Sequence, residues 1–196
     1  MKEIDRLVQI KSNNLEPRRG RLLISEPFMG DYYFGRSVVL LAEHNEEGSF
    51  GVVLNKIIHE PINAVLKGLP PFDSKIYVGG PVDTSSTFYI HTLGDKIEGS
   101  MTIGNGLYWG GDIEVVKELI ILNQLNTSNI RFFIGYSGWG ANQLKEELKR
   151  NSWIVNPNVD KSILQMPIEQ MWKNLLNSMG RIYSFWSKFP LDPTMN

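Results

Sequence analysis

The chain has 196 residues, 42% of them hydrophobic and 21% charged, and these totals are typical of a globular protein with one substantial core. Its formal net charge of -1 argues against DNA binding as the main activity, because nucleic-acid-binding modules usually carry a basic excess. The absence of cysteine excludes disulfides, thiolate catalysis and cysteine-ligated zinc.

The start of the chain, residues 1–19, is polar and charged, and it predicts a lead-in segment that is not a secretory signal. No later run approaches the roughly 18 apolar residues that a membrane-spanning helix needs. We therefore expect a cytoplasmic protein without a membrane span.

The next stretch predicts strands separated by polar turns. Residues 21–25 predict a strand, and residues 26–36 a loop that contains proline and glycine. Residues 37–44 and 50–56 are nearly continuous apolar runs, and the Asn-Glu-Glu-Gly-Ser stretch between them supplies turn residues. This pattern predicts a β-hairpin that is buried on both faces.

Further along, helix and strand signals alternate. Residues 60–70 predict a short helix, with a proline near its first position and a glycine just past its end. Residues 75–82 and 87–92 predict two strands, and the glycine-rich residues 99–112 predict short strands and turns.

The second half of the chain predicts β–α units. The expected elements are a helix at 113–125 capped by Asp112, a strand at 130–136, a helix at 141–151, a strand at 152–157 and a helix at 167–180. Residues 187–196 are expected to form a frayed tail. Strands that cluster early and β–α units that follow indicate one domain over residues 1–196, of the α+β or mixed α/β class.

One glycine-rich stretch invites a catalytic interpretation. Gly135-Tyr136-Ser137-Gly138-Trp139 nearly matches the G-x-S-x-G nucleophile elbow, but a tryptophan takes the place of the second glycine. The histidines all precede Ser137, which is not the order of an α/β-hydrolase. A hydrolase or transferase that uses Ser137 with His44 or His91 stays open as the alternative, because catalysis depends on geometry and not on chain order.

The same stretch also suggests anion binding. Glycines that open a helix present free backbone N–H groups and the positive end of the helix dipole, and both suit an anion. The competing interpretation is a tight corner whose glycines need a positive φ or close packing. The stretch fits neither the Walker A motif nor the dinucleotide-binding motif.

The acidic turn around Glu43, His44, Glu46 and Glu47 offers oxygen and imidazole ligands for a metal. Neighbours on a strand point to opposite faces, so Glu43 and His44 do not easily share a site. A solvated hairpin turn is therefore the favoured interpretation, and we expect no metal site and no cofactor.

Several motifs together resemble one known family. They are P-x-M-x-D-x-x-F-x-R-S-V at residues 27–38, EHN at 43–45, GGPV at 79–82 and GYSGWGANQL at 135–144. These stretches resemble the AlgH/YqgE family of bacterial proteins, in order, from about residue 20 to about residue 153. The resemblance implies a compact α+β domain, with a mixed sheet partly curled like a barrel and helices around it.

The resemblance implies little about activity. Members of the family often carry the label of transcriptional regulator, but no reaction and no DNA-binding motif comes with the resemblance. Many members have alanine in place of Ser137, which weakens the nucleophile interpretation further.

The favoured hypothesis is a regulatory or small-ligand-binding protein, without an assigned catalytic residue. Polar and glycine-rich turns at the ends of apolar strands motivate it, because sheet proteins often bind ligands there. The candidate binding residues are Arg36, His44, Asn45, Asn55, Gly80, Ser137, Gly138, Trp139 and Gln143. We expect an anionic small molecule or a protein as partner, and we do not expect direct DNA binding.

Overall fold

The strand β9 (Ile130–Gly140) organises a mixed sheet. In the computed structural model, which describes residues 9–157 and 159–190, ten strands form this sheet in the order β10-β1-β2-β3-β9-β6-β8-β7, with β5 and β4 attached beside β9. The other strands are β1 (Leu22–Ser25), β2 (Val38–Asn45), β3 (Gly48–Val53), β4 (Ile57–Pro61), β5 (Lys75–Val78), β6 (Val82–His91), β7 (Met101–Gly104), β8 (Leu107–Trp109) and β10 (Trp153–Asn156).

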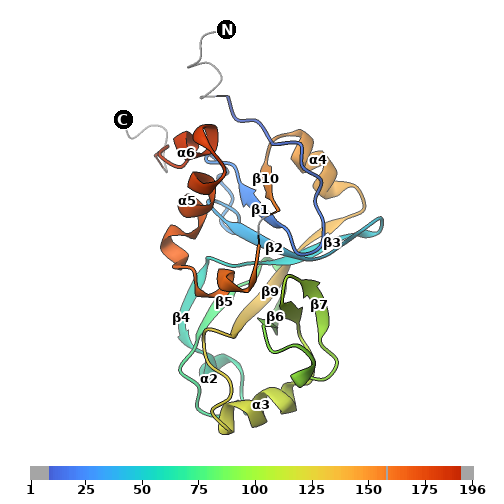
Figure 1. Ribbon diagram of the computed structural model, residues 1–196, viewed down its shortest axis with the longest axis vertical. Helices are drawn as coiled ribbons and strands as arrows, with labels where there is room; N and C mark the ends of the chain where they lie inside the picture. The colour runs from blue at the N-terminus through green and yellow to red at the C-terminus, as the bar shows by residue number, and fades with distance from the viewer. Residues whose placement is uncertain (1–8, 158, 191–196) are drawn as a thin grey trace.

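The neighbours of β9 change along its length. In its first half, Phe132 lies opposite Ile76 of the parallel strand β5 and opposite Tyr89 of the antiparallel strand β6. Its second half pairs with β3, up to Gly48 opposite Gly140. One strand therefore connects the lower group of strands in Figure 1 with the upper group, which carries β1, β2 and β10.

Short helices cover this sheet. They are α2 (Ile62–Val65), α3 (Ile113–Ile121), α4 (Gln143–Lys149), α5 (Ile168–Ser178) and α6 (Arg181–Trp186), with 3₁₀ turns η1 (Gly94–Lys96) and η2 (Lys161–Gln165). The Asp112 side chain accepts the backbone N–H of Glu114, so the predicted cap of α3 is confirmed. In α5, the indole N–H of the buried Trp172 donates to the carbonyl of Ser25 and fixes the helix to β1.

Side chains that alternate between the two faces of each strand form three buried clusters among the described residues. The central core includes Leu40, Phe133 and Trp172, the α3 core includes Leu119, Ile130 and Phe132, and the α4 core includes Val39, Trp139 and Leu144. Successive side chains of a strand point to opposite faces, so Phe132 and Phe133 serve different cores. The central core lies on one face of the sheet, and the other two cores share the opposite face.

One buried cation fastens the C-terminal part of the chain to the sheet. Arg131 on β9 donates to the carbonyls of Leu54 and Leu164, at 2.9 and 2.6 Å, and its guanidinium lies 4.5 Å from the ring centre of Tyr77. Burial lowers the pKa of Arg131. The hydrogen bonds compensate for that burial and hold η2 against the end of β3.

The α+β class and the mixed sheet are confirmed, but the barrel-like expectation needs correction because the sheet is open. Within the described residues, the edge strands β10 and β7 each pair with a single neighbour. A Cβ on Gly20 would lie 2.8 Å from the carbonyl oxygen of Ile103, so β7 approaches the start of β1. No hydrogen-bond ladder joins the two described strands there, and the sheet is curled without being closed.

The predicted short helix at 60–70 is confirmed in part, because α2 begins directly after Pro61 but has only four residues. Ile57 and Ile58 continue an extended strand that pairs with β5, and Pro61 keeps the extended conformation with φ -67° and ψ 142°. One helical turn, α2, follows.

The predicted frayed tail at 187–196 is wrong for its described part, residues 187–190. Ser187 is buried and donates to the side chain of Asn177, and Phe189 stacks on Phe28 with ring centres 5.1 Å apart. The rest of that tail, and the first eight residues of the predicted lead-in, lie outside the described residues. Over the part of the chain that the structure describes, no helix is long and apolar enough to cross a membrane.

Candidate functional site

The glycines near the middle of β9 form a strand junction, which we define as Gly79, Gly80, Gly135 and Ser137. Gly135 has φ +65°, and a Cβ there would lie 2.6 Å from the carbonyl oxygen of Gly80. A Cβ on Gly80 would lie 2.4 Å from the backbone of Tyr136. The chain can therefore cross at this point only if these positions lack side chains.

The hydroxyl of Ser137 belongs to this strand junction. It is fully buried and donates to the carbonyl of Gly79 at 2.9 Å, and the same carbonyl accepts the backbone N–H of Val53. The hydrogen bond ties β9 to the end of β5. Two of the sequence candidates, Gly80 and Ser137, are thus buried within the strand junction.

The two histidines proposed as partners of Ser137 bind other groups. The Nδ1 atom of His44 lies 2.6 Å from the Ser49 hydroxyl, and the Nε2 atom of His91 lies 3.0 Å from the Ser100 hydroxyl. Among the described residues, neither histidine therefore lies within hydrogen-bond distance of Ser137 as a base would need to.

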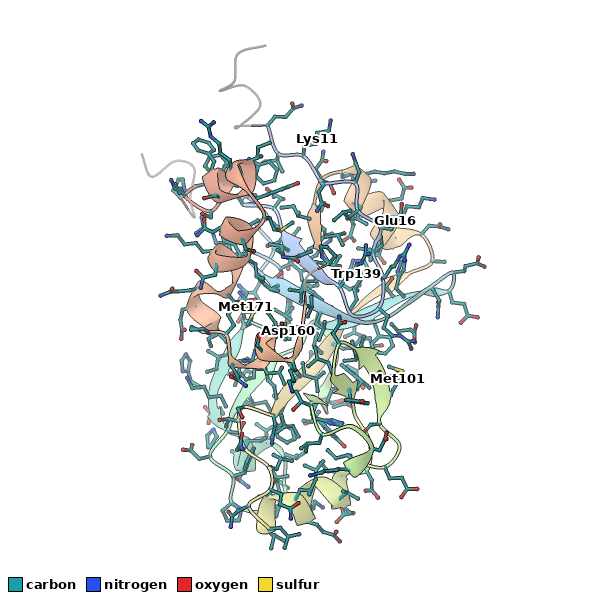
Figure 2. All side chains as sticks on the ribbon, viewed as in Figure 1. Lys11, Glu16, Met101, Trp139, Asp160 and Met171 are labelled. Carbon is teal, nitrogen blue, oxygen red and sulfur yellow. The ribbon has the colours of Figure 1, made fainter. Side chains whose placement is uncertain are left out.

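Beyond the strand junction, one face of β9 packs against α4. Trp139, labelled in Figure 2, is buried, and its indole N–H donates to Glu147 Oε2 at 2.9 Å. The indole N–H of Trp153 donates to the same oxygen at 2.7 Å, and the Gln143 amide donates to the other oxygen. Trp139 therefore fills the corner between β9 and α4, as the sequence predicted, and Gln143 helps to fix that corner.

The predicted anion loop has a different conformation. Gly138 and Gly140 belong to β9, and the backbone N–H of Gly140 donates to the Gln143 side chain at 3.0 Å. The helix α4 has seven residues and begins after Asn142, which has φ +63°. The corner thus uses the Gly140 N–H group internally and does not offer it to a ligand.

The other face of the same strand segment carries a hollow. Gly138 is exposed and lies opposite Phe50 of β3, and Gly140 lies opposite Gly48. Around these glycines we define the aromatic cleft by its four half-buried rings, Phe50, Phe88, Trp109 and Tyr136. Its volume is about 690 Å³.

The rings of the aromatic cleft meet mostly at steep angles. Tyr136 stands at 82° to Phe88 and at 78° to Phe50, and Phe50 stands at 72° to Trp109. Phe88 and Trp109 stack, with ring centres 5.5 Å apart. The rings hold one another in place through these contacts, so the walls of the cleft are preformed.

The hairpin of β2 and β3 supplies the polar rim of the aromatic cleft. Glu43, which pairs with Phe50 in the hairpin register, lines it together with Asn45 and Glu47. The Asn45 side chain accepts the backbone N–H groups of Glu47 and Gly48 and shapes the turn. None of the described residues that line this cleft is lysine, arginine or histidine.

A second hollow, which we call the α4 cleft, lies on the other side of the hairpin tip. It has a volume of about 590 Å³, and its charged or titratable lining residues are Glu16, His44, Glu46, Lys145 and Lys149. The segment that carries Glu16 runs beside α4 in Figure 2. The tip of the hairpin projects from the body in Figure 1. Asn45, Gly48 and Ser49 of this hairpin line both the mixed-charge hollow and the acidic one.

The remaining candidates, Arg36 and Asn55, lie elsewhere. Arg36 has φ +51°, its carbonyl accepts the Asn55 amide, and its guanidinium stacks over Trp172 at 4.9 Å. The Arg36 side chain also donates to the carbonyl of Phe189. Burial lowers the pKa of Arg36, and its contacts dock the C-terminal helices on the sheet.

The structure therefore gathers five of the nine sequence candidates around the end of β9: His44, Asn45, Gly138, Trp139 and Gln143. The sequence-based prediction missed the four aromatic residues of the cleft, because they come from β3, β6, β8 and β9. The pairing of a glycine with a phenylalanine across β9 and β3 is the signal that could have indicated them, but that register is not visible in the sequence. Nowhere in the described residues do three or more acidic, histidine or cysteine residues gather as a metal site would require.

Comparison with known proteins places the chain among bacterial relatives along most of its length. A family model described as AlgH-like matches residues 22–184. A UPF0301 protein of Bacteroides fragilis is 43% identical over 191 residues, covering 97% of both chains, and one of Cytophaga hutchinsonii is 46% identical over 180 residues, covering 91% of this chain and 98% of that one.

Two solved structures share the fold. The solution structure of the AlgH protein from Pseudomonas aeruginosa has a TM-score of 0.70 and 28% identity, covering 88% of this chain and 94% of that one. The crystal structure of a Corynebacterium diphtheriae protein has a TM-score of 0.75 at 23% identity, covering 89% and 94%, and it supports the fold alone.

Proposed function

This chain belongs to the AlgH-like family, and from that premise we propose that it is a small-ligand-binding protein whose ligand occupies the aromatic cleft. The proposal assigns no reaction to the chain. A regulatory role, in keeping with the label that the family often carries, would follow from ligand binding and would not require direct contact with DNA.

The observation that carries the proposal is the hollow over Gly138. A strand position without a side chain leaves room between Phe50, Tyr136 and Trp109, at the rim of the curled sheet. Ligand sites are commonly concave, mostly apolar and supplied with a few polar groups. The aromatic cleft combines these properties, with its polar groups on the hairpin.

The competing proposals have less support. A hydrolase or transferase that uses Ser137 would need its buried hydroxyl to leave the Gly79 carbonyl. The anionic small molecule that the sequence favoured would find basic partners in the α4 cleft, at Lys145 and Lys149, but Glu16 and Glu46 also line that hollow.

The proposal is tested by a thermal-shift screen of small aromatic amines, alcohols and acids, nucleosides and sugar phosphates. A ligand that binds the folded chain raises the melting temperature in proportion to the logarithm of its concentration over Kd. We expect hits among compounds with a planar ring, and their affinity should fall roughly tenfold or more in Gly138→Leu, which corresponds to about 1.4 kcal/mol or more.

Gly30→Leu is the matched control. Gly30 is exposed, and a Cβ at this position would have no heavy atom within 4 Å, so a new side chain there blocks no cleft. A screen without any hit at millimolar concentration would overturn the proposal. Hits that bind Gly138→Leu as tightly as the parent chain would place the ligand elsewhere and would overturn it as well.

A further inference from the structure

We infer that the ligand of the aromatic cleft is a cation, namely a small amine or guanidinium compound with a flat or apolar body. The inference rests on the proposed function, since it names the chemical class of ligand for the same site. Three features of the aromatic cleft support it: its rings, its carboxylates and the charges that it lacks.

The rings provide the first argument. The face of an aromatic ring carries partial negative charge and attracts a cation within about 6 Å of its centre. Phe50, Phe88, Trp109 and Tyr136 line a single hollow, and the steep angles between several of them make walls in different directions. Such walls surround an ammonium group and its alkyl substituents better than one flat stack does.

The carboxylates provide the second argument. Glu43 lies opposite Phe50 in the β2–β3 register, and residues directly opposite in an antiparallel pair share a face. Its side chain therefore belongs to the face of the hairpin that borders the rings. Glu47 lines the same hollow from the turn.

The ion pair that Glu43 forms with Arg19 is weak, so the rim of the aromatic cleft stays acidic. Arg19 approaches Glu43 at 3.8 Å, and the two side chains are 45% and 30% exposed. An exposed ion pair at this distance is weak and is screened by salt. One oxygen of Glu43 also accepts the backbone N–H of His44, and the carboxylate keeps further acceptor positions for a bound cation.

The absent charges provide the third argument. No basic side chain lines the aromatic cleft in the part of the chain that the structure describes, whereas Lys145 and Lys149 line the α4 cleft on the other side of the hairpin. An anion in the aromatic cleft would lie near the carboxylates of Glu43 and Glu47, and no described lining residue would offer it a positive charge. The hairpin thus separates two hollows of different charge, and the acidic one selects against phosphates and carboxylates.

Calorimetric titration with three indoles of similar shape tests the inference. Tryptamine carries a positive charge, tryptophol is neutral and indole-3-acetate is negative at neutral pH. We expect tryptamine to bind roughly tenfold more tightly than tryptophol, a difference within the range of a cation–π contact plus a carboxylate. Indole-3-acetate should bind most weakly, and the advantage of tryptamine should shrink as salt is added.

Charge variants locate the effect. In Glu43→Gln with Glu47→Gln, tryptamine should lose its advantage while tryptophol keeps its affinity. Glu46→Gln is the control, because Glu46 lies in the same turn but lines the α4 cleft. Tighter or equal binding of tryptophol by the parent chain would overturn the inference and leave the ligand site intact. Failure of all three indoles to bind would overturn the inference together with the proposed site.

Discussion

The carboxylate of Glu147 holds two indole rings at the corner between β9 and α4. Trp139 and Trp153 are 5% and 1% exposed, and both donate to the same oxygen of Glu147. Their rings meet at 82°, with centres 5.9 Å apart. Glu147, on the short helix α4, therefore fixes the end of β9 from one side. Gly138 lies on the other face of the same strand segment.

Replacing Glu147 with alanine should destabilise the fold by about 2–4 kcal/mol, because two buried N–H groups lose their acceptor. Glu147→Gln keeps one acceptor oxygen and should cost less. Urea unfolding followed by tryptophan fluorescence measures both, and Glu146→Ala, which removes an exposed carboxylate paired with Lys149, is the control. If Glu147→Ala and Glu146→Ala were equally stable, the structural role assigned to Glu147 would be wrong.

The buried His91 should make stability depend on pH. Its Nδ1 atom accepts the backbone N–H of Leu93 at 3.2 Å, which leaves the proton on Nε2, where the Gly110 carbonyl accepts it at 3.0 Å. Burial lowers the pKa of His91 below its ordinary value of 6.5. Between that lowered pKa and about 6.5 the unfolded chain binds more protons than the folded chain, so stability rises with pH in this window.

We therefore expect the melting temperature to fall when the pH is lowered from about 7.5 to about 5.5, across the ordinary histidine pKa. In His91→Gln, which keeps a donor for the Gly110 carbonyl, this part of the pH dependence should vanish. Melting curves of both chains over the same buffers provide the comparison. Curves with the same pH dependence in both chains would show that His91 does not cause it.

At the scale of the elements, periodic apolar runs were predictable and irregular ones were not. The hairpin at 38–53 and the helices α3 and α5 follow from apolar periodicity and their end signals. Residues 137–140 contain two glycines and give no strand signal, yet they extend β9 because β3 offers its edge. Tertiary pairing decides such segments, and the sequence does not reveal which edge is available.

The candidate site was likewise predictable only in part. The sequence indicated that the segment around Trp139 matters and that its tryptophan fills a corner. The aromatic cleft depends on four strands that are far apart in the sequence, so its rings could not be assembled without the sheet order. The sequence predicted Gly80 and Ser137 as binding residues because small residues suit both a close backbone approach and the approach of a ligand.

The strand junction should be intolerant of a side chain at Gly135. Alanine there combines a positive φ with a Cβ placed 2.6 Å from the Gly80 carbonyl oxygen, and we expect a loss of about 2–4 kcal/mol in unfolding free energy. Gly68→Ala separates the two effects, because Gly68 has φ +83° but open space around it, and it should cost about 1 kcal/mol. Urea unfolding measures both, and equal losses would contradict the crowding at the strand junction.

At the scale of the whole molecule, β9 links every feature that the proposal uses. Its first half anchors the C-terminal part of the chain through Arg131, its middle forms the strand junction, and its end separates the α4 core from the aromatic cleft. The strand junction at Gly135 therefore comes shortly before Gly138, whose missing side chain leaves room for the aromatic cleft. The fold and the candidate site depend on the same strand.

The central claim, that a ligand binds in the aromatic cleft, is tested most directly by nuclear magnetic resonance. The chain has 5 tryptophans, whose indole N–H signals resolve different places: Trp109 lines the aromatic cleft, Trp172 lines the smaller hollow beside Arg36, and Trp186 lies fully buried in the central core. During titration with tryptamine, we predict a saturable shift of the Trp109 signal, with the signals of Trp172 and Trp186 unchanged. A shift of Trp172 without Trp109, or no shift at saturating tryptamine, would contradict the account.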